Sequence, residues 1–186
     1  LPYIVDKGRL LNALIISPPK AGKTTLLRDL IRQLSNGVDR LGINGINVGL
    51  VDERSEIACC YEGVPQNDVG MRTDVLDGCP KAKGIMMLLR SMSPDLIATD
   101  EIGKNEDALA IEEVINAGVA IIATVHGSSL EEIKKRPTIR KLINRLFFDR
   151  YIILSKNLGV GKIEAILDSA TGRNLIKIRR EEKMCG

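Results

Sequence analysis

The sequence is poor in aromatic residues and has no tryptophan. Only 3% of its 186 residues are Phe, Trp or Tyr. Proteins that bind single-stranded nucleic acid without sequence preference stack the bases on several aromatic side chains. With so few aromatic residues, the core must be aliphatic. The chain also has too few aromatic side chains for a stacking surface, so we do not expect nucleic acid as a partner.

Long apolar runs and paired cysteine motifs are also missing. The run at 119–125 is far shorter than the ~20 residues of a membrane-spanning helix, and no signal peptide is visible. No Cys-x-x-Cys pair of the zinc-binding kind is present. We therefore expect a reducing cytoplasmic location, free or at the cytoplasmic face of a membrane. Because the chain begins at Leu1, almost directly on a predicted strand, we also expect a further N-terminal region in the whole protein.

Positive charge is concentrated in the last third of the chain. Residues 1–126 contain 13 Lys+Arg and 17 Asp+Glu, whereas residues 127–186 contain 14 and 7. A basic region of this size is suited to nucleic acid, an anionic membrane or an acidic neighbouring subunit, and it is equally typical of a solvated helix. The sequence leaves these alternatives open.

Apolar segments of strand length alternate with helical patterns, which predicts a three-layer α/β fold. The strand segments are apolar throughout, as expected of a mainly parallel sheet covered on both faces. A C-terminal β-hairpin is predicted from 161–167 and 174–178 around a turn at 169–173, with a frayed end after 178. The predicted strands are 11–16, 46–51, 96–99, 119–125 and 147–154, and the predicted helices are 24–34, 81–92 and 107–117.

The segment SPPKAGKTT at 17–25 follows a strand and opens a helix, which is the setting of a phosphate-binding loop. Loop amides and the helix N-terminus present donors and positive partial charge to phosphate oxygens. Lys23 would reach the β- and γ-phosphates, and Thr24 would give its hydroxyl to Mg²⁺. Ser17 replaces the usual first glycine. The predicted nucleotide-contacting residues are Ser17, Pro18, Pro19, Lys20, Ala21, Gly22, Lys23, Thr24 and Thr25.

A second motif, PDLIATDEI at 94–102, ends an apolar strand in two carboxylates. Asp100 is the predicted Mg²⁺ residue. Glu101 is placed to polarise the attacking water as a general base, with Glu53 as the next candidate. ATP and Mg²⁺ are thus the predicted cofactors, and the fold is predicted to be RecA-like, of the additional-strand, catalytic-glutamate class. We assign residues 1–168 to the ATPase domain and 169–186 to a C-terminal extension.

A third motif, IIATVHG at 121–127, ends another apolar strand and contains His126, the single histidine of the chain. Parallel strands deliver their carboxyl ends to one edge of a sheet, where ligands bind. Thr124 or His126 is therefore predicted to sense the γ-phosphate or to hold water, and His126 is counted among the catalytic candidates.

With these motifs in place, the chain resembles the stage III sporulation protein AA family of endospore-forming bacteria. The matching strings extend from about Tyr3 to Asp168. They are YIVDKGRLLNALIISPPKAGKTTLLRDL, VGLVDERSEIA, DVGMRTDVLDGCPKA, MMLLRSMSPDLIATDEIG and AIIATVHG. That family is similar to the hexameric motor ATPases of type II and type IV secretion.

The resemblance implies a cytoplasmic ATPase that powers or gates a secretion-type channel during sporulation. It implies a homo-oligomer, a hexamer in the full-length protein, and membrane-embedded channel proteins as partners. It also implies an acidic box at Asp52, Glu53 and Glu56, a histidine box at His126, and the LRxxPD-like run from Leu89 to Asp95. A transition-state arginine is expected, and the candidates are Arg54, Arg72 and Arg90.

Two alternatives to the motor remain. A nucleic-acid-dependent ATPase, such as a helicase or helicase loader, is favoured by the basic residues Lys134, Lys135, Arg136, Arg140 and Lys141. It is disfavoured by the scarcity of aromatics and by the acidic first two-thirds of the chain. A nucleotide-gated scaffold with negligible turnover is the third possibility.

Overall fold

A seven-stranded sheet forms the centre of the computed structural model, which describes residues 1–155 and 159–176. The strand order is β5-β4-β6-β7-β3-β8-β9, and a separate two-stranded sheet pairs β1 (Val5–Asp6) with β2 (Arg9–Leu10). The strands of the main sheet are β3 (Ala13–Ser17), β4 (Val48–Asp52), β5 (Thr73–Asp77), β6 (Leu96–Thr99), β7 (Ala120–His126), β8 (Arg150–Leu154) and β9 (Ile163–Asp168).

All neighbours in this sheet are parallel except β8 and β9, which are antiparallel. The carboxyl ends of β3, β4, β6 and β7 therefore meet at one edge. β7 lies between β3 and β6, so an additional strand separates the strand of the phosphate loop from the strand that ends in Asp100.

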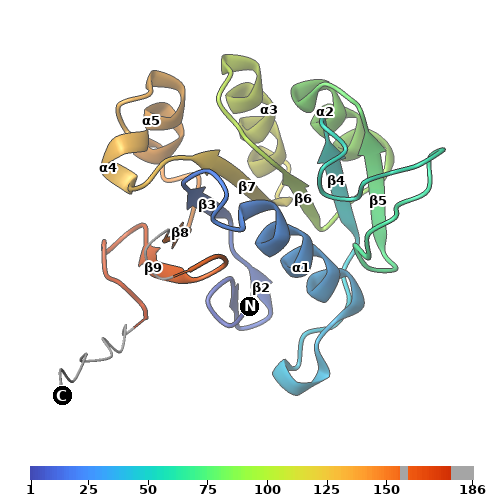
Figure 1. Cartoon of the computed structure of the whole chain (residues 1–186), viewed down its shortest axis with the longest axis horizontal. Helices are drawn as coiled ribbons and strands as arrows, with labels where there is room; N and C mark the ends of the chain where they lie inside the picture. Colours follow the sequence, from blue (N-terminus) through green and yellow to red (C-terminus); the bar gives the residue numbers. More distant parts are fainter. Residues whose placement is uncertain (156–158, 177–186) are drawn as a thin grey trace.

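Helices cover both faces of the sheet (Figure 1). α1 (Lys23–Asn36) packs on one face, and α2 (Lys81–Ser91), α3 (Asn105–Asn116) and α5 (Pro137–Asn144) lie on the other. Two further short helices are η1 (Asp39–Leu41) and α4 (Leu130–Ile133).

Alternate residues of β3 enter the two hydrophobic cores. Ala13 and Ile15 belong to the core that contains Leu27 of α1, whereas Leu14 and Ile16 belong to the core that contains Ile111 of α3. Ala13, Leu14, Ile15 and Ile16 are all fully buried. Burial on both faces explains why the segment is a continuous apolar run in the sequence. The same packing fixes the end of β3 at the carboxyl edge of the sheet.

The three-layer α/β prediction is confirmed, but several elements differ from those predicted. Residues 147–149 precede β8 instead of belonging to it. The sequence did not predict β1, β2, β5, α4 or α5. No helix within the described ranges is both long and apolar enough to span a membrane.

The C-terminal hairpin is present with a different pairing from the one predicted. The antiparallel partner of β9 is β8, and the predicted second arm contributes a single bridge between Leu167 and Asn174. The predicted turn is formed, since Asp168 N donates to Arg173 O at 2.9 Å. Residues 177–186, which include the predicted end of the arm, the frayed terminus and most of the proposed extension, lie outside the described residues.

Candidate functional site

The three motifs meet at the carboxyl edge of the sheet. β3 leads into the phosphate loop, β6 leads into Asp100 and Glu101, and β7 ends at His126. Ser17 and His126 are paired in register across β3 and β7. Residues that are far apart in the sequence are thereby placed around one site.

The loop before α1 has the backbone of an anion cradle. Gly22 has φ 90° and precedes Lys23, the first residue of the helix. No side chain caps this helix end, and no acidic residue lies in the first turn. The first amides of α1 and the positive end of its dipole therefore face a prospective phosphate without a competing carboxylate.

The C-terminal hairpin contacts this loop. Gly161 N donates to Ala21 O at 2.9 Å. A Cβ at Gly22 would lie 2.9 Å from Gly161 N, so the two backbones approach too closely for any other residue at position 22. Glycine is thus required both for its positive φ and for this contact.

Glu101 is held by three cationic or potentially cationic groups. Lys23 Nζ and His126 Nε2 lie 2.9 and 2.7 Å from Oε1, and Arg54 lies 2.7 Å from Oε2. Burial alone would raise the pKa of Glu101, but the hydrogen bond from Lys23 and the surrounding positive charges outweigh it and lower the pKa. The carboxylate is therefore kept ionised.

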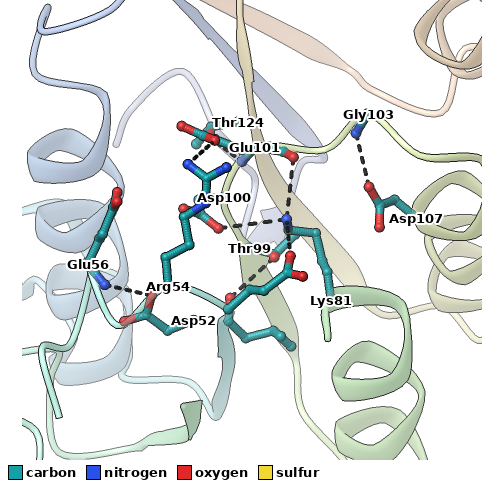
Figure 2. Close-up of polar contacts among 12 residues, drawn as sticks. Asp52, Arg54, Glu56, Lys81, Thr99, Asp100, Glu101, Gly103, Asp107 and Thr124 are labelled. Atoms are coloured by element: carbon teal, nitrogen blue, oxygen red, sulfur yellow. Dashed lines mark hydrogen bonds and ion pairs between the residues drawn. The ribbon is translucent and has the colours of Figure 1, made fainter. Parts of the chain in front are cut away.

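The backbone of Glu101 is fixed as well. Its φ is 42°, in the left-handed region that a residue with a side chain seldom adopts. Its N–H donates to Thr124 Oγ1 at 2.9 Å, and Thr124 is fully buried (Figure 2). The buried hydroxyl of Thr124 thus holds the backbone of Glu101 in place just after the end of β6.

Asp100 is buried without a hydrogen-bond partner. The residue is 1% exposed, and neither carboxylate oxygen accepts a hydrogen bond from the part of the chain that the structure describes. Burial raises the pKa of Asp100 although Lys81 and Lys23 oppose this rise. A buried carboxylate in this condition needs a cation, and its oxygens are the ligands that Mg²⁺ prefers.

Lys81 is the main site residue that the sequence reading missed. It is the first residue of α2 and is 6% exposed. Its ammonium lies 3.1 Å from Glu53 Oε2 and 3.9 Å from Asp100 Oδ1. A lysine at a helix N-terminus opposes the helix dipole, so its position in the sequence was a signal that carboxylates lie nearby.

The residues of the acidic box separate into different roles. Asp52 is fully buried, and its carboxylate accepts the backbone N–H groups of Glu56, Ile57 and Ala58 at 2.9–3.0 Å. Asp52 therefore shapes the loop that carries Arg54. The side chain of Glu53 accepts a hydrogen bond from Lys81 at 3.1 Å.

The remaining predicted residues are distributed unevenly. Ser17 is buried with its hydroxyl donating to Pro18 O at 2.9 Å, and Thr24 is half-buried. Arg72 precedes β5 at the amino edge, where it donates to Ser35 O, and Arg90 lies in the last turn of α2. Arg54 alone of the three arginines contacts Glu101. The exposed predicted loop residues are Pro19, Lys20 and Thr25.

The site fits a magnesium nucleotide on its own geometry. The uncapped end of α1 with Gly22 matches a phosphate group, and the unpartnered Asp100 carboxylate beside the phosphate loop matches Mg²⁺. Thr24 and Asp100 are the residues that would hold the ion.

Comparison with known proteins points to one family. The chain matches the model of the family described as "Sporulation stage III, protein AA" over residues 1–174. It is 49% identical over 168 residues to "Stage III sporulation protein AA" of Bacillus subtilis, covering 90% of this chain and 54% of that protein. The chain thus spans about half the length of this relative.

Solved structures with the same fold include two ATPases. The Legionella pneumophila ATPase DotB is 21% identical with a TM-score of 0.57, covering 81% of this chain and 42% of that one. The VirB11 ATPase of the Brucella suis type IV secretion system is 16% identical with a TM-score of 0.55, covering 88% and 49%. At these identities the likeness is one of fold, and it confirms the RecA-like prediction.

Proposed function

Since the chain belongs to the stage III sporulation protein AA family, we propose that it is the Mg-ATP-binding and hydrolysing core of a secretion-type motor in sporulation. The observation that carries this proposal is the ion pair between Lys23 and Glu101, 2.9 Å apart. It joins the predicted phosphate-binding lysine to the predicted general base, although 78 positions separate them in the chain.

Each residue has a distinct task in the proposed reaction. Bound Mg-ATP supplies the transferable phosphoryl group and the charge-neutralising ion. Lys23, paired with Glu101 in the free protein, would hold the phosphates with its ammonium. With Lys23 on the phosphates, Glu101 would keep its contacts with His126 and Arg54 and would accept a proton from water.

Two neighbours of Glu101 prepare it for this task. His126 Nε2 holds the carboxylate at the same oxygen as Lys23, so the carboxylate stays oriented after Lys23 leaves. Arg54, whose side chain is 58% exposed, is free to turn from Glu101 Oε2 toward developing negative charge.

We further propose a homo-hexamer, in which a neighbouring subunit helps to close the site, and membrane-embedded channel proteins as partners at the cytoplasmic face of a membrane. Residues 1–168 would form the ATPase domain, with 169–186 as its extension. These proposals rest on the family and on the shared fold of the secretion ATPases.

Two substitutions test binding and chemistry separately. Lys23→Ala should lose detectable ATP affinity, because charged hydrogen bonds to phosphate contribute about 1.5–3 kcal/mol each. Glu101→Gln should bind Mg-ATP and hydrolyse it about 10²–10⁴-fold more slowly, because an amide cannot accept the proton. Fluorescent-nucleotide titration and phosphate release measure the two effects.

Lys83→Ala, on the exposed side of α2, is the matched control for loss of a lysine. Wild-type nucleotide affinity in Lys23→Ala would overturn the site assignment. Normal turnover in Glu101→Gln would mean that the base lies elsewhere, and a wild-type chain that binds ATP without measurable turnover would favour the nucleotide-gated scaffold.

A further inference from the structure

The ammonium of Lys81 lies among oxygen atoms from the ends of β4 and β6. Nζ is 3.1 Å from Glu53 Oε2, 3.3 Å from the carbonyl oxygen of Glu101 and 3.9 Å from Asp100 Oδ1. Figure 2 shows Lys81 reaching from α2 toward Asp100 and Glu101. The side chain is 6% exposed, so the charge is removed from water and must be balanced by these oxygens.

The same set of oxygens suits a divalent cation. Two carboxylates and a backbone carbonyl are typical ligands of Mg²⁺ and Mn²⁺. Acidic residues alone would not establish such a position, but Asp100 adds an independent observation. Its carboxylate is almost fully buried, and no hydrogen bond reaches it from the described residues. The ammonium of Lys81, 3.9 Å from Oδ1, is too far away to donate a hydrogen bond, so a directly coordinating cation is the partner that this carboxylate lacks.

The placement of Lys81 is costly unless it serves these carboxylates. It is the first residue of α2, where the helix dipole repels a positive charge. Lys83, two positions later, is exposed to solvent and avoids most of this cost. The backbone therefore directs one lysine of this turn inward at the point where negative charge is concentrated.

We propose that Lys81 is a tethered cation that occupies, in the nucleotide-free protein, the position a divalent ion would otherwise take between Asp100 and Glu53. The ammonium balances both carboxylates and keeps free Mg²⁺ from binding between them. The metal then enters together with the nucleotide, because phosphate oxygens supply the additional ligands. This inference relies on the proposed function for the role of Asp100, and it assigns Glu53 to Lys81 rather than to water.

Mn²⁺ binding to the nucleotide-free chain tests the inference without any ATPase measurement. Free Mn²⁺ is measured by electron paramagnetic resonance in a titration of wild type, Lys81→Met and Lys81→Arg. Methionine fills a similar volume without charge, so Lys81→Met should bind Mn²⁺ at least about tenfold more tightly than wild type through the two carboxylates. Lys81→Arg keeps the charge and should show no such gain.

Two further variants make the result specific. Lys83→Met removes an exposed lysine from the same turn and should leave Mn²⁺ affinity unchanged. Lys81→Met combined with Glu53→Gln should lose the gained affinity, because one of the two carboxylates is then neutral. Circular dichroism establishes that each variant is folded.

The inference is overturned if folded Lys81→Met binds Mn²⁺ no better than wild type. It is also overturned if wild type without nucleotide already binds Mn²⁺ and Asp100→Asn removes that binding, a comparison that does not need Lys81→Met to fold. Gained Mn²⁺ affinity in Lys81→Met together with no ATP binding by wild type would instead support the tethered cation and reject the proposed ATPase.

Discussion

At the scale of single residues, the charge on Glu101 is shared among side chains from three different segments. Lys23 comes from the phosphate loop, Arg54 from the loop after β4 and His126 from the end of β7. Because two of these groups contact the same oxygen, removal of either one leaves Glu101 ionised but less well oriented. Substitution of one neighbour can therefore disturb the orientation of the Glu101 carboxylate without removing its negative charge.

His126 provides a test of positioning. His126→Ala should lower turnover by about tenfold or more, the size usual for a group that orients a reactive side chain. The free energy of unfolding should change by less than about 1 kcal/mol, because a side chain that is 42% exposed contributes little through its ion pair. His126→Gln retains an N–H donor and should recover part of the rate. A large loss of thermal stability with normal turnover would assign His126 to the fold.

Asp100 should destabilise the free protein. Asp100→Asn is expected to raise the free energy of unfolding by about 1–3 kcal/mol at neutral pH, because it removes a buried charge that accepts no hydrogen bond from the described residues and lies 3.9 Å from the ammonium of Lys81. Mg²⁺ dependence of nucleotide binding should weaken in the same variant. Thermal unfolding with and without Mg-ATP measures both effects, and a less stable nucleotide-free Asp100→Asn would contradict the prediction.

The pH dependence gives this prediction a sign. Burial raises the pKa of Asp100 in the folded chain above its unfolded value. Ionisation therefore costs stability at pH values above the folded pKa, and the wild type recovers this cost as pH falls through that value. The difference between Asp100→Asn and wild type should be largest at neutral pH and should shrink on acidification. The neighbouring charge of Glu101 also raises the pKa of Asp100, so part of the difference between the two proteins reflects this repulsion.

At the scale of elements, the site depends on two loops that pack against the phosphate loop and the end of β6. The loop after β4 is held by Asp52 and by Arg28, which donates to the carbonyl oxygens of Glu56 and Ile57. The turn between β8 and β9 is bonded to Ala21. Neither loop belongs to the phosphate-binding segment 17–25, yet the contacts of both help to fix where the residues of the site point.

The contact between the phosphate loop and the hairpin predicts the effect of a single methyl group. Gly22→Ala should destabilise the chain by about 1–3 kcal/mol, because an alanine at φ 90° is strained and its Cβ would collide with Gly161 N. Nucleotide affinity should fall with it. Gly161→Ala is the control, since φ there is also positive but none of the described residues has an atom within 4 Å of an added Cβ. Equal stability losses in both variants, measured by urea unfolding, would show that the contact contributes nothing.

The sequence predicted the buried elements far better than the exposed ones. β3 and β6 are apolar throughout because both of their faces are covered. β5 is an edge strand with Asp74 and Asp77 exposed, so its composition resembles that of a loop. The same limit applies to α5, a short helix that buries only part of one side and carries exposed basic residues on the other.

The motifs likewise revealed only part of the site. Lys23, Asp100, Glu101 and His126 were found because each follows or ends a strand of recognisable type. Lys81 was not predicted as a site residue because it reaches the site from a helix. Its role depends on the packing of α2 beside β4 and β6. Strand ends can be anticipated from periodicity, whereas a contact between a helix and two strands requires the tertiary structure.

At the scale of the whole molecule, the charge is divided between the two ends of the sheet. The acidic residues Asp68, Asp74 and Asp77 lie on or near β5 at one end, and the basic segment 134–145, which includes α5, follows β7 near the other. Part of the basic charge is balanced internally, since Arg136 contacts Glu132 and Arg145 contacts Glu112. The positive charge left for a partner is therefore smaller than the sequence alone indicates.

The distribution of aromatic side chains leads to the prediction for nucleic acid. Phe148 and Tyr151 are buried in the core, and Tyr3 and Tyr61, 39% and 67% exposed, lie in separate segments far apart in the chain. They provide no continuous surface on which successive bases could stack. Single-stranded DNA or RNA should therefore change the ATPase rate by less than about twofold at physiological salt. Any binding at low salt should come from phosphate contacts with the exposed Lys134 and Lys135 side chains and should weaken steeply as salt rises. Fluorescence anisotropy with a labelled oligonucleotide, run beside the ATPase assay in a salt series, measures both effects.

A severalfold stimulation that persists at physiological salt would favour the nucleic-acid-dependent ATPase over the secretion-type motor. Salt-sensitive binding without stimulation would leave the motor as the better account, because the positive charge of segment 134–145 then contributes affinity but no coupling to the site at Glu101.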